Sequence, residues 1–395
     1  MQTPTLLSLT LAFVLSAFPA GAQPAWTQTV KDRPVAPGSV MVESVWTASR
    51  PPHGEYDRIA LRRFVKAGGA GVERPVFFYL PGTNMNGAAA LTEERHNLWI
   101  YLAARGLDVY TMDYRTNAVP ETPPADMSFM EGWTYGAFVD DIAAAVAQAK
   151  RISGRDRVFL AGFSRGVSLA YLYAAERWRS DLCGLVMLDG GLKSPRPSAA
   201  FDLEKARAEL LAQKRFASDV SGRTGWTGRQ ELMRRASSTP AGEATDPKFK
   251  DAREQLASVL YNAWRPGGLA NPVEGYSDAS VLATLLAGYD RFYPAIQDIE
   301  GRALSDFDDH PALPYDDKLR EVDVPVLTFN STGMGLQFVL SGVYTPSLLA
   351  TGDVSVHVLE GYGHLDVLVG TRAPEDVFEP TYRWLQSRAR CQVRQ

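Results

Sequence analysis

Two stretches of the sequence carry side chains that could act together in nucleophilic catalysis. Gly162-Phe-Ser164-Arg-Gly166 places a serine between two glycines, after a strand-like apolar run and before a helix-like segment. His364 lies in a stretch with two glycines near the end of the chain. A serine hydroxyl is a poor nucleophile until a base removes its proton, and imidazole is suited to that role. The pair predicts attack of Ser164 on a carbonyl carbon, with His364 as the base.

The glycines around Ser164 have a steric reason. A serine in a tight turn between strand and helix is strained, and side chains at the flanking positions would collide with neighbouring backbone. Such a turn lifts the hydroxyl above the carboxyl edge of the sheet and places a helix N-terminus behind it. The free N–H groups there can stabilise a developing oxyanion. The bare motif is short enough to arise by chance, so its position between a strand and a helix is what carries the prediction.

The elements that must position these residues alternate between strand and helix. Strands are predicted at 39–48, 59–66, 75–80, 108–114, 157–161 and 182–188, and again at 324–329 and 354–359. Helices are predicted at 91–105, 138–150, 167–176 and from Pro374 to about Ser387. This rhythm indicates an α/β fold with a mainly parallel central sheet flanked by helices. The rhythm breaks between 192 and 322, where helical patterns without clear strands predict a large insertion after the sixth strand.

From about residue 55 to residue 390 the chain resembles the α/β-hydrolase superfamily, in particular serine esterases and lipases with a helical cap. The resemblance rests on the order of elements, the Ser164 turn, the loop after the 75–80 strand, the insertion point and the late histidine. It implies that Ser164 is the nucleophile and that the backbone N–H of Arg165 is one oxyanion donor. The second donor would come from Leu80-Pro81-Gly82-Thr83-Asn84, with Thr83 preferred and Asn84 as the alternative. The resemblance also favours His364 over the other four histidines, which do not have the right place in chain order: His53, His96, His310 and His357.

The acid that should orient His364 departs from the common pattern of the superfamily. Most members place it after the strand that here is 324–329, yet no Asp or Glu occurs between Asp323 and Asp353. Some members place it one strand earlier, where Asp189 ends the 182–188 strand, so we expect Asp189 to be the third catalytic residue. Asp366 is too close to His364 in sequence to orient it. Two alternatives remain open: a carboxylate from the insertion (Asp308 or Asp309), and a dyad steadied by Asn330. Asp113, which ends the 108–114 strand, is expected to be structural.

The insertion at 192–322 occupies the position of a cap. It contains aromatic side chains that could line a pocket for a partly apolar acyl or alcohol group, or form the core of the cap itself: Trp226, Tyr261, Trp264, Tyr276, Tyr289, Phe292 and Tyr293. Its acidic residues at 306, 308, 309, 316 and 317 are read as a solvated charged face rather than a calcium site. No phosphate loop or dinucleotide fingerprint occurs, and no cofactor or metal is expected.

Composition and the N-terminus bound the remaining possibilities. The 395 residues carry 41 Lys+Arg and 45 Asp+Glu, a net charge of −4 without a long basic run, which argues against nucleic acid as a partner. Residues 1–22 read as a signal peptide, with an uncharged apolar run and Ala20-Gly21-Ala22 before a cleavage predicted ahead of Gln23. The mature protein is therefore expected to be periplasmic or secreted, without stable membrane insertion. In such a compartment Cys183 and Cys391 could pair, or Cys183 could be a buried free thiol.

These observations predict four parts: a signal peptide at 1–22, the first part of a hydrolase core at 23–191, a cap at 192–322 and the second part of the core at 323–395. The predicted activity is hydrolysis of a small-molecule carboxylic ester, or a lactone, through an acyl-enzyme on Ser164. Two other functions remain open at this point. One is a non-catalytic binding protein on a hydrolase fold, which the missing acid after 324–329 suggests. The other is an acyltransferase that uses the same nucleophile.

Overall fold

The fold is built on one large sheet. A computed structural model describes residues 24–68, 74–122, 124–196, 201–219, 235–236, 238–244, 246–256 and 276–392. The signal peptide predicted at 1–22 lies outside these residues. The strands of the large sheet are β1 (Thr27–Pro34), β2 (Met41–Ser49), β3 (Arg58–Lys66), β4 (Val76–Leu80), β5 (Asp108–Asp113), β6 (Val158–Phe163), β7 (Leu182–Leu188), β10 (Val326–Ser331) and β11 (Val354–Leu359).

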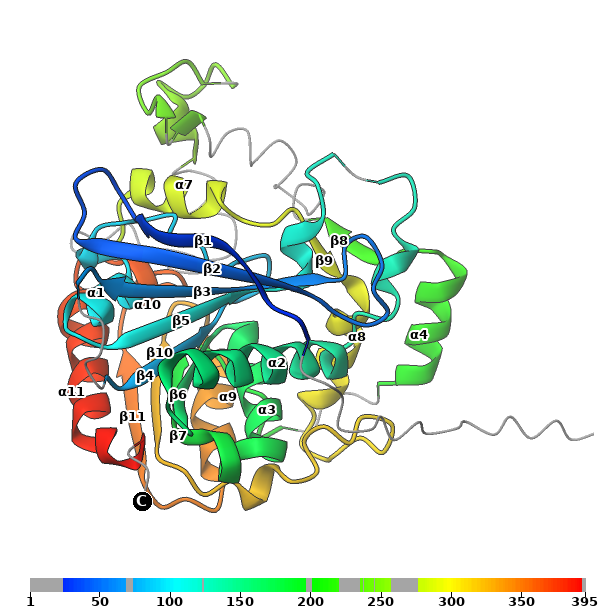
Figure 1. The fold of residues 1–395 in the computed structure, drawn as a ribbon. Helices are drawn as coiled ribbons and strands as arrows, with labels where there is room; N and C mark the ends of the chain where they lie inside the picture. The colour runs from blue at the N-terminus through cyan, green and yellow to red at the C-terminus, as the bar shows by residue number, and fades with distance from the viewer. Residues whose placement is uncertain are drawn as a thin grey trace, which may run out of the picture.

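The sheet combines an antiparallel side with a parallel side. Its nine strands follow the order β1-β2-β3-β5-β4-β6-β7-β10-β11 (Figure 1). β1, β2 and β3 pair antiparallel, and β3 pairs antiparallel with β5. From β5 to β11 all pairs are parallel. The carboxyl ends of β4, β6, β7, β10 and β11 therefore share one edge of the sheet, which is where a parallel sheet gathers its functional loops.

Helices cover both faces of the sheet. Alternate side chains of β4 enter two separate cores: Phe77 and Tyr79 pack with α1 and α11, whereas Phe78 and Leu80 pack with α2 and α3. The run of apolar residues in each central strand follows from burial on both faces. The helices are α1 (Leu98–Ala104), α2 (Tyr135–Ser153), α3 (Arg165–Asp181), α4 (Leu203–Ala212), α7 (Ala279–Ala287), α8 (Ala295–Leu304), α9 (Leu336–Ser347), α10 (Asp366–Val369) and α11 (Glu379–Arg388).

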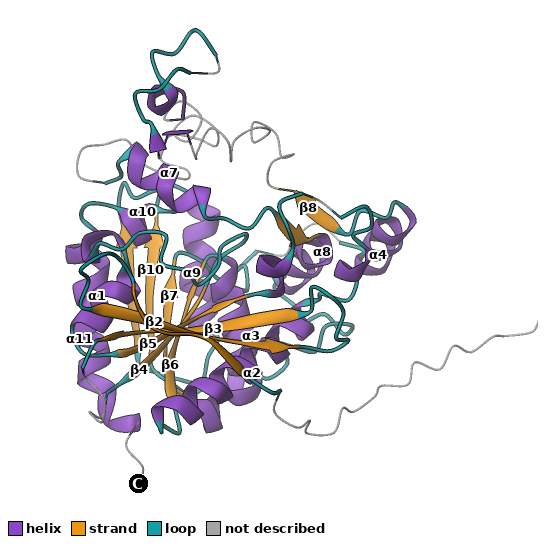
Figure 2. Ribbon diagram, turned by 45° about the horizontal axis from the view of Figure 1, so that its top comes forward, coloured by secondary structure: helices purple, strands orange, loops and turns teal. Residues whose placement is uncertain are grey.

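The chain between β7 and β10 leaves the sheet. It carries α4, α7 and α8, together with a small antiparallel pair of β8 (Ala217–Asp219) and β9 (Phe292–Pro294). Figure 2 shows α4, α7, α8 and β8 along the upper edge of the view, beyond the ends of the strands. We call this part of the chain the inserted segment. Among its aromatic residues Phe292 and Tyr293 are buried, Tyr276 and Tyr289 are half-buried, and Trp226, Tyr261 and Trp264 lie outside the described residues.

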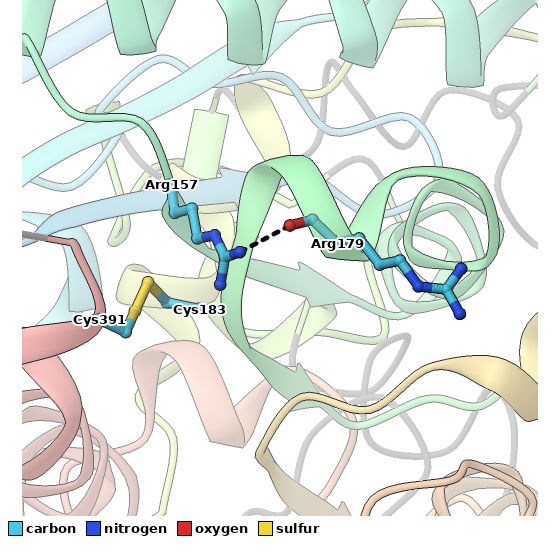
Figure 3. Close-up of a disulfide and its surroundings, with 4 residues drawn as sticks. All are labelled: Arg157, Arg179, Cys183 and Cys391. Atoms are coloured by element: carbon cyan, nitrogen blue, oxygen red, sulfur yellow. Dashed lines mark hydrogen bonds between the residues drawn. A yellow bond between two sulfur atoms is a disulfide. The ribbon is translucent and has the colours of Figure 1, made fainter. Parts of the chain in front are cut away.

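A disulfide joins the end of the chain to the sheet. Cys183, the second residue of β7, is bonded to Cys391, with their Cα atoms 5.8 Å apart (Figure 3). Close by, the guanidinium of Arg157 donates to the carbonyl of Arg179 at 2.8 Å (Figure 3). Cys183 lies near the start of β7 and Asp189 follows its last residue, so the disulfide lies at the opposite edge of the sheet from the loops described below. Of the two states left open for Cys183, the structure has the paired one.

Three details differ from what the sequence patterns predict. β1 lies in a stretch where the sequence patterns predict no strand, since seven of its eight side chains are exposed and give no alternating apolar signal. The inserted segment contains the short strands β8 and β9, where no strand was expected. The helix predicted at 91–105 is a short 3₁₀ turn, η1 (Glu94–His96), followed by α1.

In the described part of the chain, helices are too short or too polar to cross a bilayer.

Candidate active site

Ser164 stands at the turn between β6 and α3. Its backbone has φ 54° and ψ −120°, a left-handed conformation that a serine rarely adopts. Its N–H donates to the carbonyl of Leu188 at 3.1 Å, which ties the turn to the neighbouring strand β7. A Cβ at Gly162 would lie 2.2 Å from the carbonyl oxygen of Gly166, and one at Gly166 would lie 2.3 Å from that of Leu80. Both glycines are therefore sterically required, as the motif predicts.

His364 lies in the loop after β11, above the same edge of the sheet. Its ring stacks on Phe163, the residue before Ser164, with ring centroids 4.6 Å apart. Phe338 of α9 meets the ring edge-on at 5.2 Å. The histidine is only 7% exposed. The two aromatic rings hold the imidazole at the start of the Ser164 turn.

Asp189 is the carboxylate that contacts His364. Its Oδ2 lies 2.6 Å from Nδ1 of the imidazole, and Asp189 is fully buried. Ser331 completes the surroundings: its N–H donates to Oδ1 at 2.6 Å and its hydroxyl to Oδ2 at 2.6 Å. Hydrogen bonds of this kind stabilise an ionised carboxylate in a buried position. A neutral imidazole that donates from Nδ1 to this carboxylate has its Nε2 lone pair available as a base.

The other residues considered for the acid make different contacts. Asp366 accepts from the N–H of Gly363 at 2.6 Å and from the hydroxyl of Ser277, so it holds the loop that carries His364. The amide of Asn330 donates to the carbonyl of His357 at 3.3 Å. Asp309 forms an ion pair with Lys193 at 3.0 Å. The structure thus brings Asp189 to the imidazole.

Lys193 corrects one expectation about the acidic residues of the inserted segment. Its ammonium group is buried and lies 2.6 Å from a carboxylate oxygen of Asp316, which is itself 1% exposed. Asp316 therefore does not belong to a solvated charged face. Burial raises the pKa of Asp316, and the hydrogen bond and charge of Lys193 act in the opposite direction. In the portion of the chain that the structure describes, no group of three or more His, Cys, Asp or Glu side chains could hold a metal ion.

The loop after β4 lies against the Ser164 turn. A Cβ at Gly82 would lie 3.1 Å from Cβ of Ser164, so only a glycine allows this approach without displacement. Thr83 is half-buried, and among the described residues its N–H has no hydrogen-bond partner. Asn84 is buried, has φ 61°, and turns its amide toward the inserted segment. Thr83 therefore has a backbone donor to offer beside Ser164.

Arg165 supplies the other expected donor. It is the first residue of α3, so its N–H has no acceptor within the helix. Its side chain links α3 to two other parts of the site: Nε donates to the hydroxyl oxygen of Thr83 at 3.0 Å, and Nη2 lies 2.5 Å from Asp298 of α8. The guanidinium also lies over the ring of Tyr293, 4.8 Å from its centroid. Sequence patterns carry no signal for these contacts, because the partners are more than 80 and 130 positions away from Arg165.

Ser331 is a second residue that sequence patterns do not reveal. It ends β10, at the place where most members of the superfamily were expected to carry the acid. β10 pairs with β7 so that Phe329 lies opposite Leu188. This register sets the residues that follow the two strands side by side. A hydroxyl residue at the carboxyl end of β10, where an acid was expected, is the one sequence signal that could have suggested the contact.

Comparisons with known proteins agree with this architecture. No protein-family model matches the chain, and curated proteins give no match to its sequence. Among solved structures, a protein from Sulfolobus solfataricus, provisionally assigned as a lipase, is 27% identical with a TM-score of 0.74; the alignment covers 92% of this chain and 99% of that one. An esterase from Rhodococcus sp. ECU1013 is 16% identical with a TM-score of 0.50, over 87% of this chain and 99% of that one. With its mostly parallel sheet and flanking helices, the chain is a member of the α/β-hydrolase superfamily.

Proposed function

We propose that the protein is an exported serine hydrolase that cleaves a carboxylic ester, or a lactone, through an acyl-enzyme on Ser164. The observation that carries the proposal is the 2.6 Å contact between Nδ1 of His364 and the buried carboxylate of Asp189, beside the strained Ser164 turn. A buried Asp bonded to the distal nitrogen of a histidine holds the imidazole in the tautomer that can accept a serine proton. A binding protein has no need of that arrangement.

The steps follow from these groups. Ser164 Oγ attacks the carbonyl carbon while Nε2 of His364 takes the hydroxyl proton, and Asp189 stabilises the imidazolium. The N–H groups of Thr83 and Arg165 hold the oxyanion of the tetrahedral intermediate. The intermediate expels the alcohol, which receives the proton from His364. Water then attacks the acyl-enzyme, gives one proton to His364, and releases the acid as Ser164 regains its hydrogen.

A partly apolar substrate is the class that the surroundings favour. Phe338 contacts the imidazole edge-on, and Leu336, at the start of the same helix, is 65% exposed. An acyl chain next to His364 could cover these side chains, which would remove apolar surface from water. The provisional lipase assignment of the Sulfolobus solfataricus protein supports the same substrate class. In this proposal residues 192–322 act as the cap over the site.

Export remains part of the proposal. It is supported by the leader-like residues 1–22 and by the disulfide between Cys183 and Cys391, since disulfides persist in oxidising compartments. Expression of the full chain in a bacterium, followed by fractionation and mass measurement, tests it. A protein found outside the cytoplasm and beginning at Gln23 is expected. An uncleaved chain in the cytoplasm would contradict export without affecting the chemistry.

Labelling with a fluorophosphonate tests the chemistry. The purified protein should form an adduct on Ser164, identified by peptide mass spectrometry, and Ser164→Ala and His364→Ala should form none. His310→Ala is the matched control, because that histidine lies in a turn of the inserted segment and, among described groups, its imidazole bonds only to the N–H of Ala312 at 3.2 Å. A folded protein that forms no adduct would overturn the proposal. Hydrolysis of p-nitrophenyl esters with and without a competing alcohol then separates a hydrolase from an acyltransferase.

A further inference from the structure

The loop at residues 82–87, which we call the oxyanion loop, is fixed to the core at one end. The N–H of Gly87 donates to Asp113 at 2.8 Å, and the hydroxyl of Thr111 donates to the carbonyl of Gly87 at 2.7 Å. A Cβ at Gly87 would lie 2.4 Å from that hydroxyl oxygen, so the contact is close. These anchors hold residue 87. They do not account for the position of the middle of the loop, where the N–H of Thr83 must point toward the oxyanion.

Asp290 of the inserted segment holds the middle of the oxyanion loop. Its N–H donates to the carbonyl of Asn84 at 2.7 Å, and the amide of Asn84 donates back to the carbonyl of Asp290 at 2.9 Å. The amide of Asn86 donates to Oδ1 of Asp290 at 3.0 Å. Asn84 has φ 61°, a conformation that costs free energy unless its surroundings enforce it. The reciprocal bonds to Asp290 supply that enforcement.

The same carboxylate also binds the turn after β5. The 3₁₀ helix η2 (Arg115–Ala118) contributes the hydroxyl of Thr116, 2.8 Å from Oδ2, and the amide of Asn117, 2.9 Å from Oδ1. Asp290 is only 8% exposed. It thereby joins three separate pieces of chain: the oxyanion loop, η2 and the inserted segment.

No cation compensates this buried charge within the described residues. The nearest cationic neighbour in sequence, Arg291, is paired with Asp219 at 2.8 Å. Asp113, the charged group that acts on Asp290 from the core, is acidic and is itself paired with Arg62 at 2.7 Å. Burial raises the pKa of Asp290 to about 6, against the three hydrogen bonds, which lower it. A buried carboxylate without a neighbouring cation costs stability, so the groups that it binds are where a functional role is to be sought.

We propose that Asp290 is a positioning residue that sets the oxyanion loop, so that the inserted segment controls the geometry in which Thr83 meets the oxyanion. The inference rests on the proposed serine hydrolase mechanism. It ties one residue of the cap to the catalytic machinery: a displacement of residue 290 pulls Asn84 and Asn86, and with them the neighbouring N–H of Thr83. Ground-state binding of the ester does not depend on that N–H, whereas the tetrahedral intermediate does.

A graded pair of variants tests the proposal. Asp290→Ala removes every side-chain acceptor and should lower kcat by roughly 30- to 100-fold, less than the full loss of an oxyanion donor. Asp290→Asn keeps one acceptor oxygen for the amides and should lower kcat by roughly 5- to 10-fold, with KM within threefold of wild type in both. Affinity for a trifluoromethyl ketone, which forms a tetrahedral oxyanion on Ser164, should fall by the same factors. Asp219→Ala is the matched control, a carboxylate in the same segment that pairs with Arg291, and should leave kcat unchanged.

The pH dependence separates positioning from a merely structural role. Protonated Asp290 resembles an amide, so the ketone affinities of wild type and D290N should differ at pH 8 and converge by pH 5. The quantity to compare is the ratio of the two ketone affinities at each pH, because groups common to both proteins contribute equally to it. A ratio that does not vary with pH, or a D290A enzyme with wild-type kcat and ketone affinity, would overturn the inference.

Two further results complete the design. If D290A does not fold, Asn84→Gly keeps the left-handed backbone and deletes only the amide, and it should show the same selective loss of kcat and ketone affinity. A wild-type kcat in Asn84→Gly would count against the proposal. If wild type neither hydrolyses esters nor reacts with a fluorophosphonate, the proposed function itself fails. An active wild type with unaffected Asp290 variants refutes only the positioning role.

Discussion

Replacement of Asp189 by asparagine is the sharpest test of the candidate triad. The change keeps the shape of a fully buried side chain and removes its charge. Three donors surround the carboxylate: Nδ1 of His364 and the hydroxyl of Ser331 at Oδ2, and the backbone N–H of Ser331 at Oδ1, each at 2.6 Å. An amide has only one acceptor oxygen, so one of these positions must receive an NH₂ group.

The backbone donor decides which position that is. The N–H of Ser331 belongs to the end of β10 and cannot turn away, whereas the hydroxyl of Ser331 can rotate and accept a hydrogen bond. The amide oxygen of the variant should therefore face the N–H of Ser331, and the NH₂ group should face His364. The imidazole must then accept at Nδ1 and carry its proton on Nε2. In that tautomer it has no lone pair to receive the proton of Ser164.

The size of the effect follows from these contacts. The variant loses the charge-assisted hydrogen bond between His364 and the carboxylate, worth about 1.5–3 kcal/mol. Returning the imidazole to the productive tautomer would set its Nδ1–H against the amide NH₂ group, which costs about 1–3 kcal/mol. The sum, about 2.5–6 kcal/mol, corresponds to a loss of roughly 10²- to 10⁴-fold in kcat. Loss of this order is typical when the acid of a Ser–His–Asp triad becomes an amide.

The assay compares kcat, fluorophosphonate labelling and thermal unfolding of wild type and Asp189→Asn. Asp309→Asn is the control, because Asp309 was the alternative acid from the inserted segment and is 45% exposed. We expect wild-type kcat from the control and a folded but nearly inactive Asp189→Asn. A folded Asp189→Asn within tenfold of wild type, or an equal loss in Asp309→Asn, would refute the tautomer argument.

Three further outcomes are expected. Reduction of the disulfide between Cys183 and Cys391, or Cys391→Ser, should lower the free energy of unfolding by about 5 kcal/mol on the chain-entropy model for a separation of 208 residues, seen as a fall in Tm of several degrees; equal Tm with and without reductant would contradict it. Gly166→Ala should cost about 3 kcal/mol in urea unfolding and abolish labelling, because its Cβ would lie 2.3 Å from the carbonyl oxygen of Leu80. The pKa of Asp290 is raised from 3.8 to about 6, so the folded state binds a proton more tightly than the unfolded state. This group should therefore lower the free energy of unfolding by about 3 kcal/mol as pH rises from 3.8 to 6, and the loss should persist above that; the difference between urea titrations of wild type and Asp290→Asn should isolate it from the other carboxylates.

The parts of the site that could be predicted from sequence are those fixed by local geometry. The turn at Ser164 is specified within a few residues, since a strand, two glycines and a helix leave one backbone path. Asp189 could be reached because it ends a strand, and parallel strands bring their carboxyl ends to one edge. The structure places Asp189 against His364, although the two are 175 residues apart in sequence. Their catalytic roles remain predictions.

The parts that escaped prediction depend on contacts between distant segments. Ser331 meets Asp189 only because β10 pairs with β7 in one particular register. The ion pair of Lys193 with Asp316 likewise joins positions 123 residues apart, so the acidic residues could not be sorted into buried and exposed from sequence alone. β1 escaped for another reason: its side chains are exposed on both faces, and an edge strand without a buried face has no apolar period to detect.

Asp290 shows why such contacts matter for function. A well-packed apolar side chain in its place would avoid the free-energy cost of burying a carboxylate without a cation. Replacement of buried charges by apolar side chains often raises the free energy of unfolding for this reason. That replacement would also release Asn86, Thr116 and Asn117 from their shared acceptor. The chain thus keeps a group that lowers its stability at neutral pH and that bonds to the loop beside Ser164. A cap that only covered the site would not need a buried carboxylate at this position. A cap that positions the oxyanion loop needs a group that contacts the loop and accepts hydrogen bonds from several donors at once, and Asp290 is such a group.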